Sequence, residues 1–553
     1  MGSAGASPAV LGALAENLLA FASARPGPPP TSQSARAPTG SARGGRAPQN
    51  QFWRVKLESR VRLESKEITI MLLQTEIEKT LTRRAFLARS TTGLGAIALG
   101  ALLRRDLFGA DGSVPALKPK GALPSLHFAP KAKRVIYLFQ SGAPSHIDLF
   151  DPKTKLTQMT GDELPPSVRM GQRITGMTAG QKALLCVGSA YPFKRYGRSG
   201  VELSEMIPNI GGIVDEIAII RSMFTEPINH DPAVTFLGTG HQQPGRPTIG
   251  AWLSYGLGSE NDNLPAFVVL TSGGGGQPLQ SRYWGNGFLP GNHQGVLFRG
   301  QGDPVLYVSN PPGLSQTSRR QLIDAMQELN RKQLGALGDP AIATHIENYE
   351  LAFRMQASVP ELMDIAQEPK EILELYGAEP GKSSFANNCL LARRLAERGV
   401  RFIQLCHRDW DHHSGLPEGI KNQTKNTDKA SAALVKDLKA RGLLDDTLVI
   451  WGGEFGRTAY SQGEIKKNNF GRDHHPRCFS IWMAGGGIKP GVVLGATDDF
   501  GYNIVEDPVN VHDFHATLLH LLGIDHKQLT YRFEGRDYRL TDIQGELVEK
   551  LLA

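Results

Sequence analysis

Cysteine is scarce in this sequence. The 553 residues contain four cysteines, at positions 186, 389, 406 and 478, which is too few for a disulfide scaffold. Cys406 and Cys478 lie in or at the start of apolar runs, so we expect both to be buried as small hydrophobic side chains. The fold is therefore not expected to depend on disulfide bonds.

A charge excess is also missing from most of the chain. Residues 1–70 carry nine Lys or Arg and four Asp or Glu, and residues 71–110 carry six and three. Because the whole chain has a formal charge of +7, residues 111–553 carry −1. The basic character therefore belongs to the N-terminal segments, and it gives no argument for a nucleic-acid partner.

The N-terminal region has the pattern of an export signal. Arg83 and Arg84 form a twin-arginine pair, and an apolar stretch rich in Gly and Ala follows at 93–103. This stretch is too short to span a bilayer. The pattern predicts the twin-arginine export machinery as a partner and a periplasmic or extracellular location. It also predicts no transmembrane span in the mature chain, unless the signal is retained.

The position of this signal suggests a late start of translation. Residues 21–50 are rich in Pro, Gly, Ser, Ala and Arg, a composition that cannot bury a core. Met71 opens a signal of ordinary length. We therefore expect residues 1–70 to be a disordered or misassigned extension, residues 71–110 to be the signal, and the folded domain to follow at about 125–545.

Short apolar runs alternate with helical patterns through this domain. Strands are predicted at 134–139, 217–222, 267–270, 400–406, 447–451 and 479–483, and helices at 384–399, 428–442 and 509–523. Residues 315–377 also have helical periodicity, whereas the Gly- and Pro-rich residues 273–313 predict a long loop. The alternation predicts an α/β fold with a mostly parallel sheet covered on both faces.

Three polar clusters follow separate predicted strands. Residues 407–413 contain three His and two Asp, and further candidates are Glu454 and the run Asp473-His474-His475. Carboxylates and neutral imidazoles are preferred ligands of Zn and similar divalent metals. Because open α/β sheets place their sites just past the carboxyl ends of strands, the clusters predict a metal site.

Several motifs resemble known families. The segment 445–458, Asp-Asp-Thr-Leu-Val-Ile-Trp-Gly-Gly-Glu-Phe-Gly-Arg-Thr, is similar to a metal-binding strand of the alkaline phosphatase and sulfatase superfamily. Together with Ser-Gly-Ala-Pro-Ser-His-Ile-Asp-Leu-Phe-Asp (141–151), Asn-His-Asp-Pro-Ala (229–233) and the twin arginine, it resembles the exported family of unknown function numbered 1501. This resemblance implies an alkaline phosphatase-like three-layer α/β sandwich with a mostly parallel central sheet.

The resemblance also implies metal ligands. Cofactor-independent phosphoglycerate mutases of this superfamily bind one metal through an Asp, a His four residues later and a distant His. Asp409 and His413 keep this spacing, and His475 precedes a strand as the distant His does. With Glu454, these residues are the implied ligands of a divalent metal such as Zn or Mn. Their neighbours His412 and His474 can take either role.

Other positions depart from the superfamily pattern. Glu454-Phe455 stands where the superfamily has an Asp-His pair, so one imidazole ligand is lost. His230 stands where sulfatases have their modified cysteine. We therefore do not expect the ordinary sulfatase reaction from this chain. An imidazole can act as nucleophile or general base near neutral pH, and Arg457 can clamp an oxyanion, so His230 and Arg457 are the candidate catalytic residues.

Two classes of function remain open. The first is an exported metal-dependent hydrolase of phosphate or sulfate esters, with a small molecule or a polysaccharide as substrate. The alternative is a catalytically inactive relative that serves as a binding or scaffold module at the cell envelope. The lost Asp-His pair and nucleophile favour the module, whereas three polar clusters at strand ends favour the hydrolase. We expect the hydrolase.

Overall fold

The computed structural model describes residues 121–553, apart from residues 275–278, 307–308, 311–312, 339 and 467–468. The predicted extension 1–70 and signal 71–110 lie outside the described residues. Within the described part of the chain, no helix has both the length and the apolar character that a membrane span requires.

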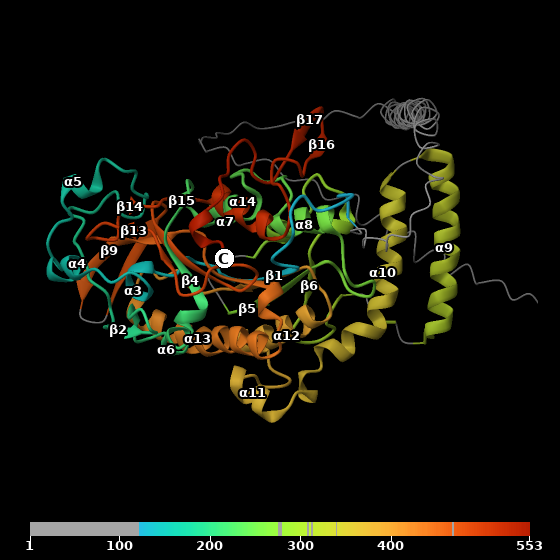
Figure 1. Ribbon diagram of the computed structural model, residues 1–553, viewed down its shortest axis with the longest axis horizontal. Helices are drawn as coiled ribbons and strands as arrows, with labels where there is room; N and C mark the ends of the chain where they lie inside the picture. The colour runs from blue at the N-terminus through green and yellow to red at the C-terminus, as the bar shows by residue number, and fades with distance from the viewer. Residues whose placement is uncertain (1–120, 275–278, 307–308, 311–312, 339, 467–468) are drawn as a thin grey trace, which may run out of the picture. The chain divides into compact units, whose positions relative to one another are not determined.

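A nine-stranded sheet lies at the centre of the described chain (Figure 1). Its order is β12-β4-β11-β8-β1-β7-β5-β6, with β15 also paired to β4. All pairs are parallel except those of β11 with β4 and β8, so the predicted mostly parallel α/β class is confirmed. The strands are β1 (Arg134–Gln140), β4 (Ile217–Phe224), β5 (Phe267–Ser272), β6 (Val296–Phe298), β7 (Phe402–His407), β8 (Thr447–Gly452), β11 (Phe479–Ala484), β12 (Val493–Leu494) and β15 (Val509–Asn510).

Helices cover both faces of this sheet (Figure 1). Successive residues of a strand point to opposite faces. Ile136 and Leu138 of β1 therefore pack with α6, α12 and α13, whereas Val135, Tyr137 and Phe139 pack with α7, α8 and α14. These helices are α6 (Pro208–Gly211), α7 (His230–Thr239), α8 (Ile249–Leu257), α12 (Phe385–Glu397), α13 (Leu416–Ala440) and α14 (Val511–Leu521).

Two of the predicted helices match closely and one is longer than expected. The patterns at 384–399 and 509–523 correspond to α12 and α14. The helix predicted at 428–442 begins at Leu416, after Gly415 in a left-handed conformation (φ 59°). Its first turns bury Leu416 and Ile420, although most of their neighbours are polar. This sparse apolar face explains why the sequence pattern missed the helix start.

The remaining elements form the periphery of the domain. The predicted helical region 315–377 contains α9 (Gln316–Leu337), α10 (Pro340–Met363) and α11 (Lys370–Tyr376). The predicted loop 273–313 contains the short strand β6 and two single turns of 3-10 helix, η2 (Ser281–Trp284) and η3 (Gly291–His293). Further short helices are α3 (His146–Leu149), α4 (Thr154–Gln158) and α5 (Pro166–Arg169). Small two-stranded sheets are β2 (Phe193–Tyr196) with β3 (Val201–Ser204), β13 (Ala496–Thr497) with β14 (Ile504–Glu506), and β16 (Tyr531–Phe533) with β17 (Arg536–Tyr538).

One further hairpin was not predicted and carries part of the site. Strand β9 (Gly456–Lys466) pairs with β10 (Asn469–His475) outside the central sheet. The sequence of β10 is rich in polar residues, yet its last six residues are buried. This strand therefore places charged and imidazole side chains inside the protein.

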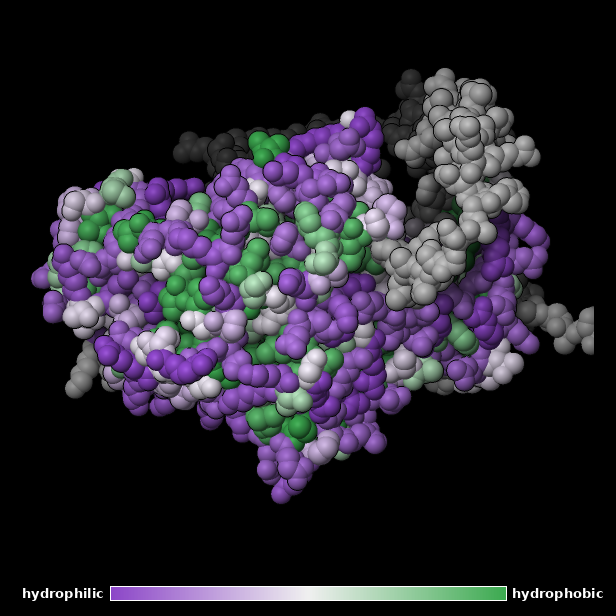
Figure 2. Space-filling view, viewed as in Figure 1, coloured by the Kyte–Doolittle hydropathy of each residue, from purple (hydrophilic) through white to green (hydrophobic). Residues whose placement is uncertain are grey.

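The cysteines are buried, and the surface face in Figure 2 is mostly hydrophilic. All four cysteines are buried and free, as expected for Cys406 and Cys478. On the face drawn in Figure 2, hydrophilic side chains cover most of the area and hydrophobic ones form separate patches.

Candidate metal centre

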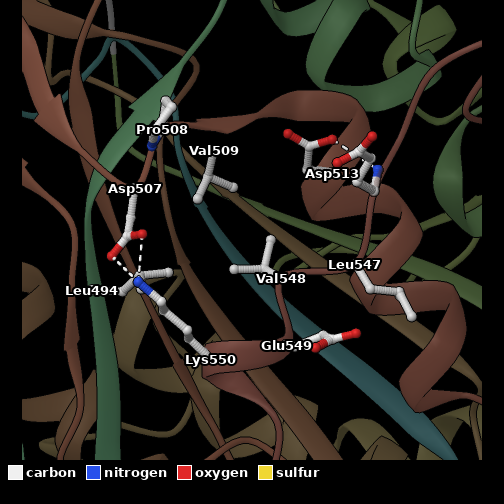
Figure 3. Close-up of a pocket in the computed structure, with 10 residues that line it drawn as sticks. Leu494, Asp507, Pro508, Val509, Asp513, Leu547, Val548, Glu549 and Lys550 are labelled. Atoms are coloured by element: carbon white, nitrogen blue, oxygen red, sulfur yellow. Dashed lines mark hydrogen bonds and ion pairs between the residues drawn. The ribbon is translucent and has the colours of Figure 1, made fainter.

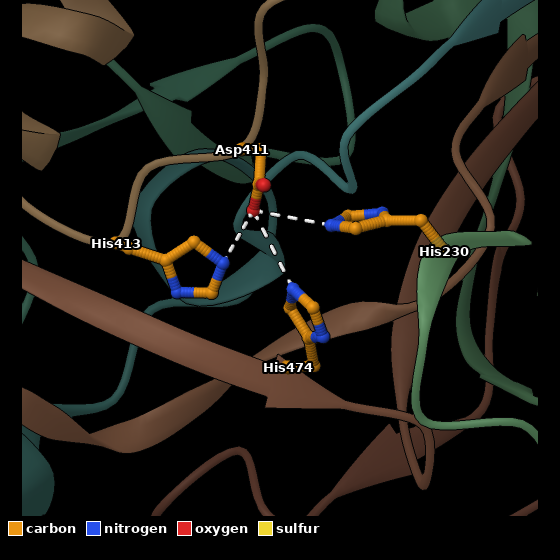
Figure 4. A group of neighbouring side chains, drawn as sticks. All are labelled: His230, Asp411, His413 and His474. Carbon is orange, nitrogen blue, oxygen red and sulfur yellow. Dashed lines mark ion pairs between the residues drawn. The ribbon is translucent and has the colours of Figure 1, made fainter. Parts of the chain in front are cut away.

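Four side chains converge at the edge of the central sheet (Figure 4). They are His230, Asp411, His413 and His474, and one potential ligand atom from each lies within 4.8 Å of all the others. Asp411 Oδ1 is 3.2 Å from His230 Nε2, 2.8 Å from His413 Nε2 and 3.5 Å from His474 Nε2. The group is thus built around one carboxylate oxygen.

Three elements supply this group. His230 is the first residue of α7, His474 lies near the end of β10, and the other two residues lie in the loop between β7 and α13. The strands β7, β1 and β8 are parallel and adjacent, so their carboxyl ends meet at this edge. The site therefore occurs where open α/β sheets usually have theirs.

The loop that carries Asp411 and His413 is held against its neighbours by backbone contacts. The Trp410 N–H donates to the Ser141 carbonyl at 3.3 Å. Gly142 has φ +106°, and a Cβ at that position would lie 2.7 Å from the Asp411 nitrogen. A residue with a side chain at position 142 would therefore push the loop away from the sheet edge.

Each imidazole is also held on its outer side. His230 Nδ1 lies 2.5 Å from Glu454 Oε1, His413 Nδ1 lies 2.5 Å from Gln462 Oε1, and His474 Nδ1 lies 2.8 Å from the Ile228 carbonyl oxygen. These oxygen atoms accept a hydrogen bond from Nδ1–H. The tautomer that donates from Nδ1 leaves the Nε2 lone pair free.

The inner nitrogen atoms fit metal ligation. His230 Nε2 and His474 Nε2 are buried and face Asp411 Oδ1 at 3.2 and 3.5 Å. An outer acceptor that fixes the tautomer of a histidine is typical of metal-binding sites. Tetrahedral ligands of Zn, each about 2.0–2.2 Å from the ion, lie about 3.4 Å apart. The three Nε2 atoms lie 2.8–3.5 Å from Asp411 Oδ1, and all four ligand atoms lie within 4.8 Å of one another. Three imidazoles and one carboxylate therefore suit Zn or a similar divalent ion.

Burial and the charges of the group shift the pKa values of its members. Burial raises the pKa of Asp411, but hydrogen bonds from His230, His413 and His474 and the charge of Arg457 outweigh it and hold that pKa far below its usual range. Burial lowers the pKa of His474 to about 4, which keeps its imidazole neutral near pH 7. For His230, burial lowers the pKa, but Asp411 and Glu454 raise it by more, so the net shift is upward.

Two predicted site residues form an outer layer around the group. Arg457 Nη2 lies 2.6 Å from Asp411 Oδ1, and the same guanidinium donates to the carbonyls of Gly142, Ala143 and Arg472. Glu454 is completely buried and accepts the Gly142 N–H at 3.0 Å. Arg457 therefore balances the charge of Asp411, and Glu454 orients His230.

The structure brings together some of the residues implied by sequence and not others. His230 and His413 belong to the group, whereas Asp409 and His475 do not. Asp409 has φ +82° and accepts a hydrogen bond from the Gly274 nitrogen at 2.8 Å. His475 is buried, with its Nε2 2.7 Å from the Tyr502 carbonyl oxygen.

Residues close to Asp409 and His475 in the sequence belong to the group in their place. Asp411 stands in the group where Asp409 was expected, and His474, which the sequence had left open as an alternative, stands there instead of His475. Asp409, Asp411 and His413 are each two residues apart and lie outside any strand, so their spacing does not single out Asp411. The sequence likewise has no signal that separates His474 from His475.

A buried ion pair supports β10 beside the group. Arg472 Nε donates to Asp148 Oδ2 at 2.7 Å, and both side chains are completely buried. Asp148 also accepts from Ser145 Oγ at 2.5 Å and from the Ala190 nitrogen at 2.9 Å. The charge of Arg472 is thus compensated inside the protein, two residues before His474.

A separate pocket shares no residue with this group (Figure 3). Its volume is about 380 Å³, and its lining includes Asp507, Asp513, Glu549 and Lys550. Lys550 Nζ is paired with Asp507, 2.6 and 2.8 Å from the two carboxylate oxygens. The pocket thus has none of the imidazoles that distinguish the four-residue group.

Comparisons with known proteins bear on the family and not on the reaction. No curated protein matches the sequence. Three solved structures that align with it are an alkaline phosphatase superfamily protein from Vibrio parahaemolyticus (15% identity, 78% of this chain and 75% of that chain, TM-score 0.30), the PsFucS1 sulfatase from Pseudoalteromonas sp. (12%, 71% and 68%, 0.31) and the alkaline phosphatase of the Antarctic bacterium TAB5 (10%, 67% and 94%, 0.26). At these TM-scores the likeness supports no inference about activity. The family described as "Protein of unknown function (DUF1501)" matches residues 132–552, and the chain therefore belongs to that family.

Proposed function

We propose that this protein is a metal-dependent hydrolase of phosphate or sulfate esters, and that His230, Asp411, His413 and His474 bind its divalent ion. The observation that supports the proposal most directly is the convergence of three Nε2 atoms on Asp411 Oδ1. A divalent ion that takes a fifth ligand beside these four residues would supply Lewis acidity and a water of lowered pKa for ester hydrolysis.

The surrounding residues have defined tasks in this proposal. Arg457 balances the negative charge of Asp411, and Glu454 fixes the ring of His230. The side chains of His413 and Asp411 are 25% and 18% exposed, so an ester can approach the group from their side. Because both ring nitrogens of His230 face protein groups of the centre, we propose a ligand role for it in place of the nucleophile role.

One observation favours a binding or scaffold module as the second candidate. Arg457, predicted to clamp the anionic group of a substrate, is 1% exposed and donates to three backbone carbonyls as well as to Asp411. It therefore serves the protein interior. A module of this kind would bind the metal and hydrolyse no ester.

Metal analysis of the purified protein tests the ligand assignment. We expect one Zn or Mn per chain by inductively coupled plasma mass spectrometry, and loss of metal in His413→Ala and His474→Ala, because each variant lacks one of the four proposed ligands. His412→Gln is the matched control, since His412 lies between two group residues but outside the group. Stoichiometric metal in both alanine variants would refute the assignment.

An ester screen then separates the two functions. The metal-loaded wild-type chain and His474→Ala would be assayed with aryl phosphates, aryl sulfates and sulfated oligosaccharides. Hydrolysis by the wild type that the variant lacks supports the hydrolase. A fully loaded wild type that is no more active than the variant supports the module.

We also propose export by the twin-arginine route. The proposal is supported by Arg83 and Arg84 followed by a short apolar stretch. In a bacterial host with a functional pathway, the double substitution Arg83→Lys and Arg84→Lys should leave the chain in the cytoplasm, as seen by cell fractionation. Unchanged export of the double variant would contradict the proposal.

A further inference from the structure

Gln462 contacts the metal centre through the outer nitrogen of His413. Its Oε1 atom lies 2.5 Å from His413 Nδ1, the same distance that separates Glu454 Oε1 from His230 Nδ1. It lies in β9, a strand that the sequence did not predict. Neither the sequence motifs nor the family assignment gives this residue a role.

The pairing of β9 with β10 independently places Gln462 beside His413. Gln462 is directly opposite Gly471 in this antiparallel pair, so the side chains of both positions point to the same face. A Cβ at Gly471 would lie 1.9 Å from the His413 carbonyl oxygen. The face to which Gln462 points is therefore the face against which His413 packs.

The hairpin also fixes the backbone around His413. The Arg472 nitrogen donates to the His412 carbonyl at 3.1 Å, and the Gly415 nitrogen donates to Asn469 Oδ1 at 3.1 Å. With the backbone held on both sides, the remaining freedom of His413 is rotation of its ring. The Gln462 amide oxygen acts on that rotation.

We propose that Gln462 is a positioning residue of the metal centre, which accepts the Nδ1–H of His413 and so directs the Nε2 lone pair to the ion. This inference rests on the proposed metal-binding function and deepens it. An amide oxygen can only accept at this position, so it selects the tautomer with the proton on Nδ1. The tautomer with the proton on Nε2 cannot bind a metal through that atom.

Zinc affinities of three variants test the inference. Gln462→Leu removes the acceptor at similar size, Gln462→Glu restores an acceptor, and Gln181→Leu removes another glutamine that bonds to the same hairpin, at the Ser461 carbonyl and the Gly463 nitrogen. The dissociation constant for Zn²⁺ would be measured by competition with a chromophoric chelator. The visible spectrum of the Co²⁺-loaded protein would report the ligand geometry.

We expect Gln462→Leu to weaken Zn²⁺ binding about 10- to 100-fold and to change the Co²⁺ spectrum, as for outer partners of metal-binding histidines in general. Gln462→Glu and Gln181→Leu should both stay close to the wild type. Wild-type affinity in Gln462→Leu, or a loss in Gln462→Glu as large as in Gln462→Leu, would overturn the inference and leave the proposed function standing. A wild-type chain that binds no Zn²⁺, Mn²⁺ or Co²⁺ would instead overturn the proposed function.

Discussion

Substitution of Gly471 by alanine should damage the metal centre without altering any ligand. The new Cβ would lie 1.9 Å from the His413 carbonyl oxygen and 2.0 Å from its carbonyl carbon. Ordinary contact begins at 3.4 Å, so β10 and the loop that carries His413 must separate by 1.5 Å. Because His474 lies on β10, the separation moves two of the four proposed ligands apart.

This displacement is large compared with the tolerance of a metal site. Ligand distances in such sites are held to within about 0.2 Å, so a shift of 1.5 Å cannot be absorbed by longer bonds. We expect Zn²⁺ affinity to fall at least as far as in His413→Ala. Overpacking of a buried contact should also reduce the free energy of unfolding by about 1–3 kcal/mol.

Two measurements check the prediction against a matched control. Competition with a chelator gives the Zn²⁺ dissociation constant, and urea unfolding of the metal-free chain gives the stability. Gly176→Ala is the control, because a Cβ there would meet no heavy atom within 4 Å. If Gly471→Ala bound Zn²⁺ and unfolded like the control, the close contact between β10 and the loop would be refuted.

Three further predictions follow from other contacts. Removal of the metal with EDTA should lower the melting temperature of the wild type but not of His474→Ala, because a ligand at 100 times its dissociation constant stabilises the folded state by about 2.7 kcal/mol. Asp148→Asn should destabilise the chain by about 3–5 kcal/mol in urea, since it leaves the buried Arg472 charge uncompensated. Burial raises the pKa of Asp148, but Arg472 lowers it by more, so the stability from this pair is present above about pH 4 and should be lost as the pH falls through the folded-state pKa. Asp148→Asn should therefore lose less stability on acidification than the wild type, and an equally acid-sensitive variant would refute this source. Arg457→Met should lower the melting temperature, because Asp411 and three backbone carbonyls lose their donor; an unchanged melting temperature would contradict the role of Arg457.

The sequence by itself was sufficient for six of the nine strands of the central sheet, and it missed the short strands β6, β12 and β15. The runs at 134–139, 447–451 and 479–483 are almost wholly apolar because strands covered by helices on both faces bury every side chain. Such runs are visible without any knowledge of their partners. The three polar clusters at strand ends were visible for the same reason, since each interrupts the apolar pattern.

Tertiary structure alone decided which members of each cluster face the centre. His474 and His475 are consecutive residues of β10, so they point to opposite sides, and the side that faces Asp411 is set by the pairing with β9. That pairing is irregular, with a register shift between Arg472 and His474. A shift of this kind redirects side chains and leaves no mark in the composition.

The loop after β7 also shows that the sequence does not reveal which side chains face the centre. Asp409 adopts φ +82° and accepts from a backbone nitrogen, whereas Asp411 receives three imidazoles and a guanidinium from distant parts of the chain. Both are aspartates in one short segment, and only contacts from α7, β9 and β10 distinguish them. The sequence therefore determined that acids and imidazoles gather at this edge of the sheet, and the packing of those elements around the edge determined which of them meet.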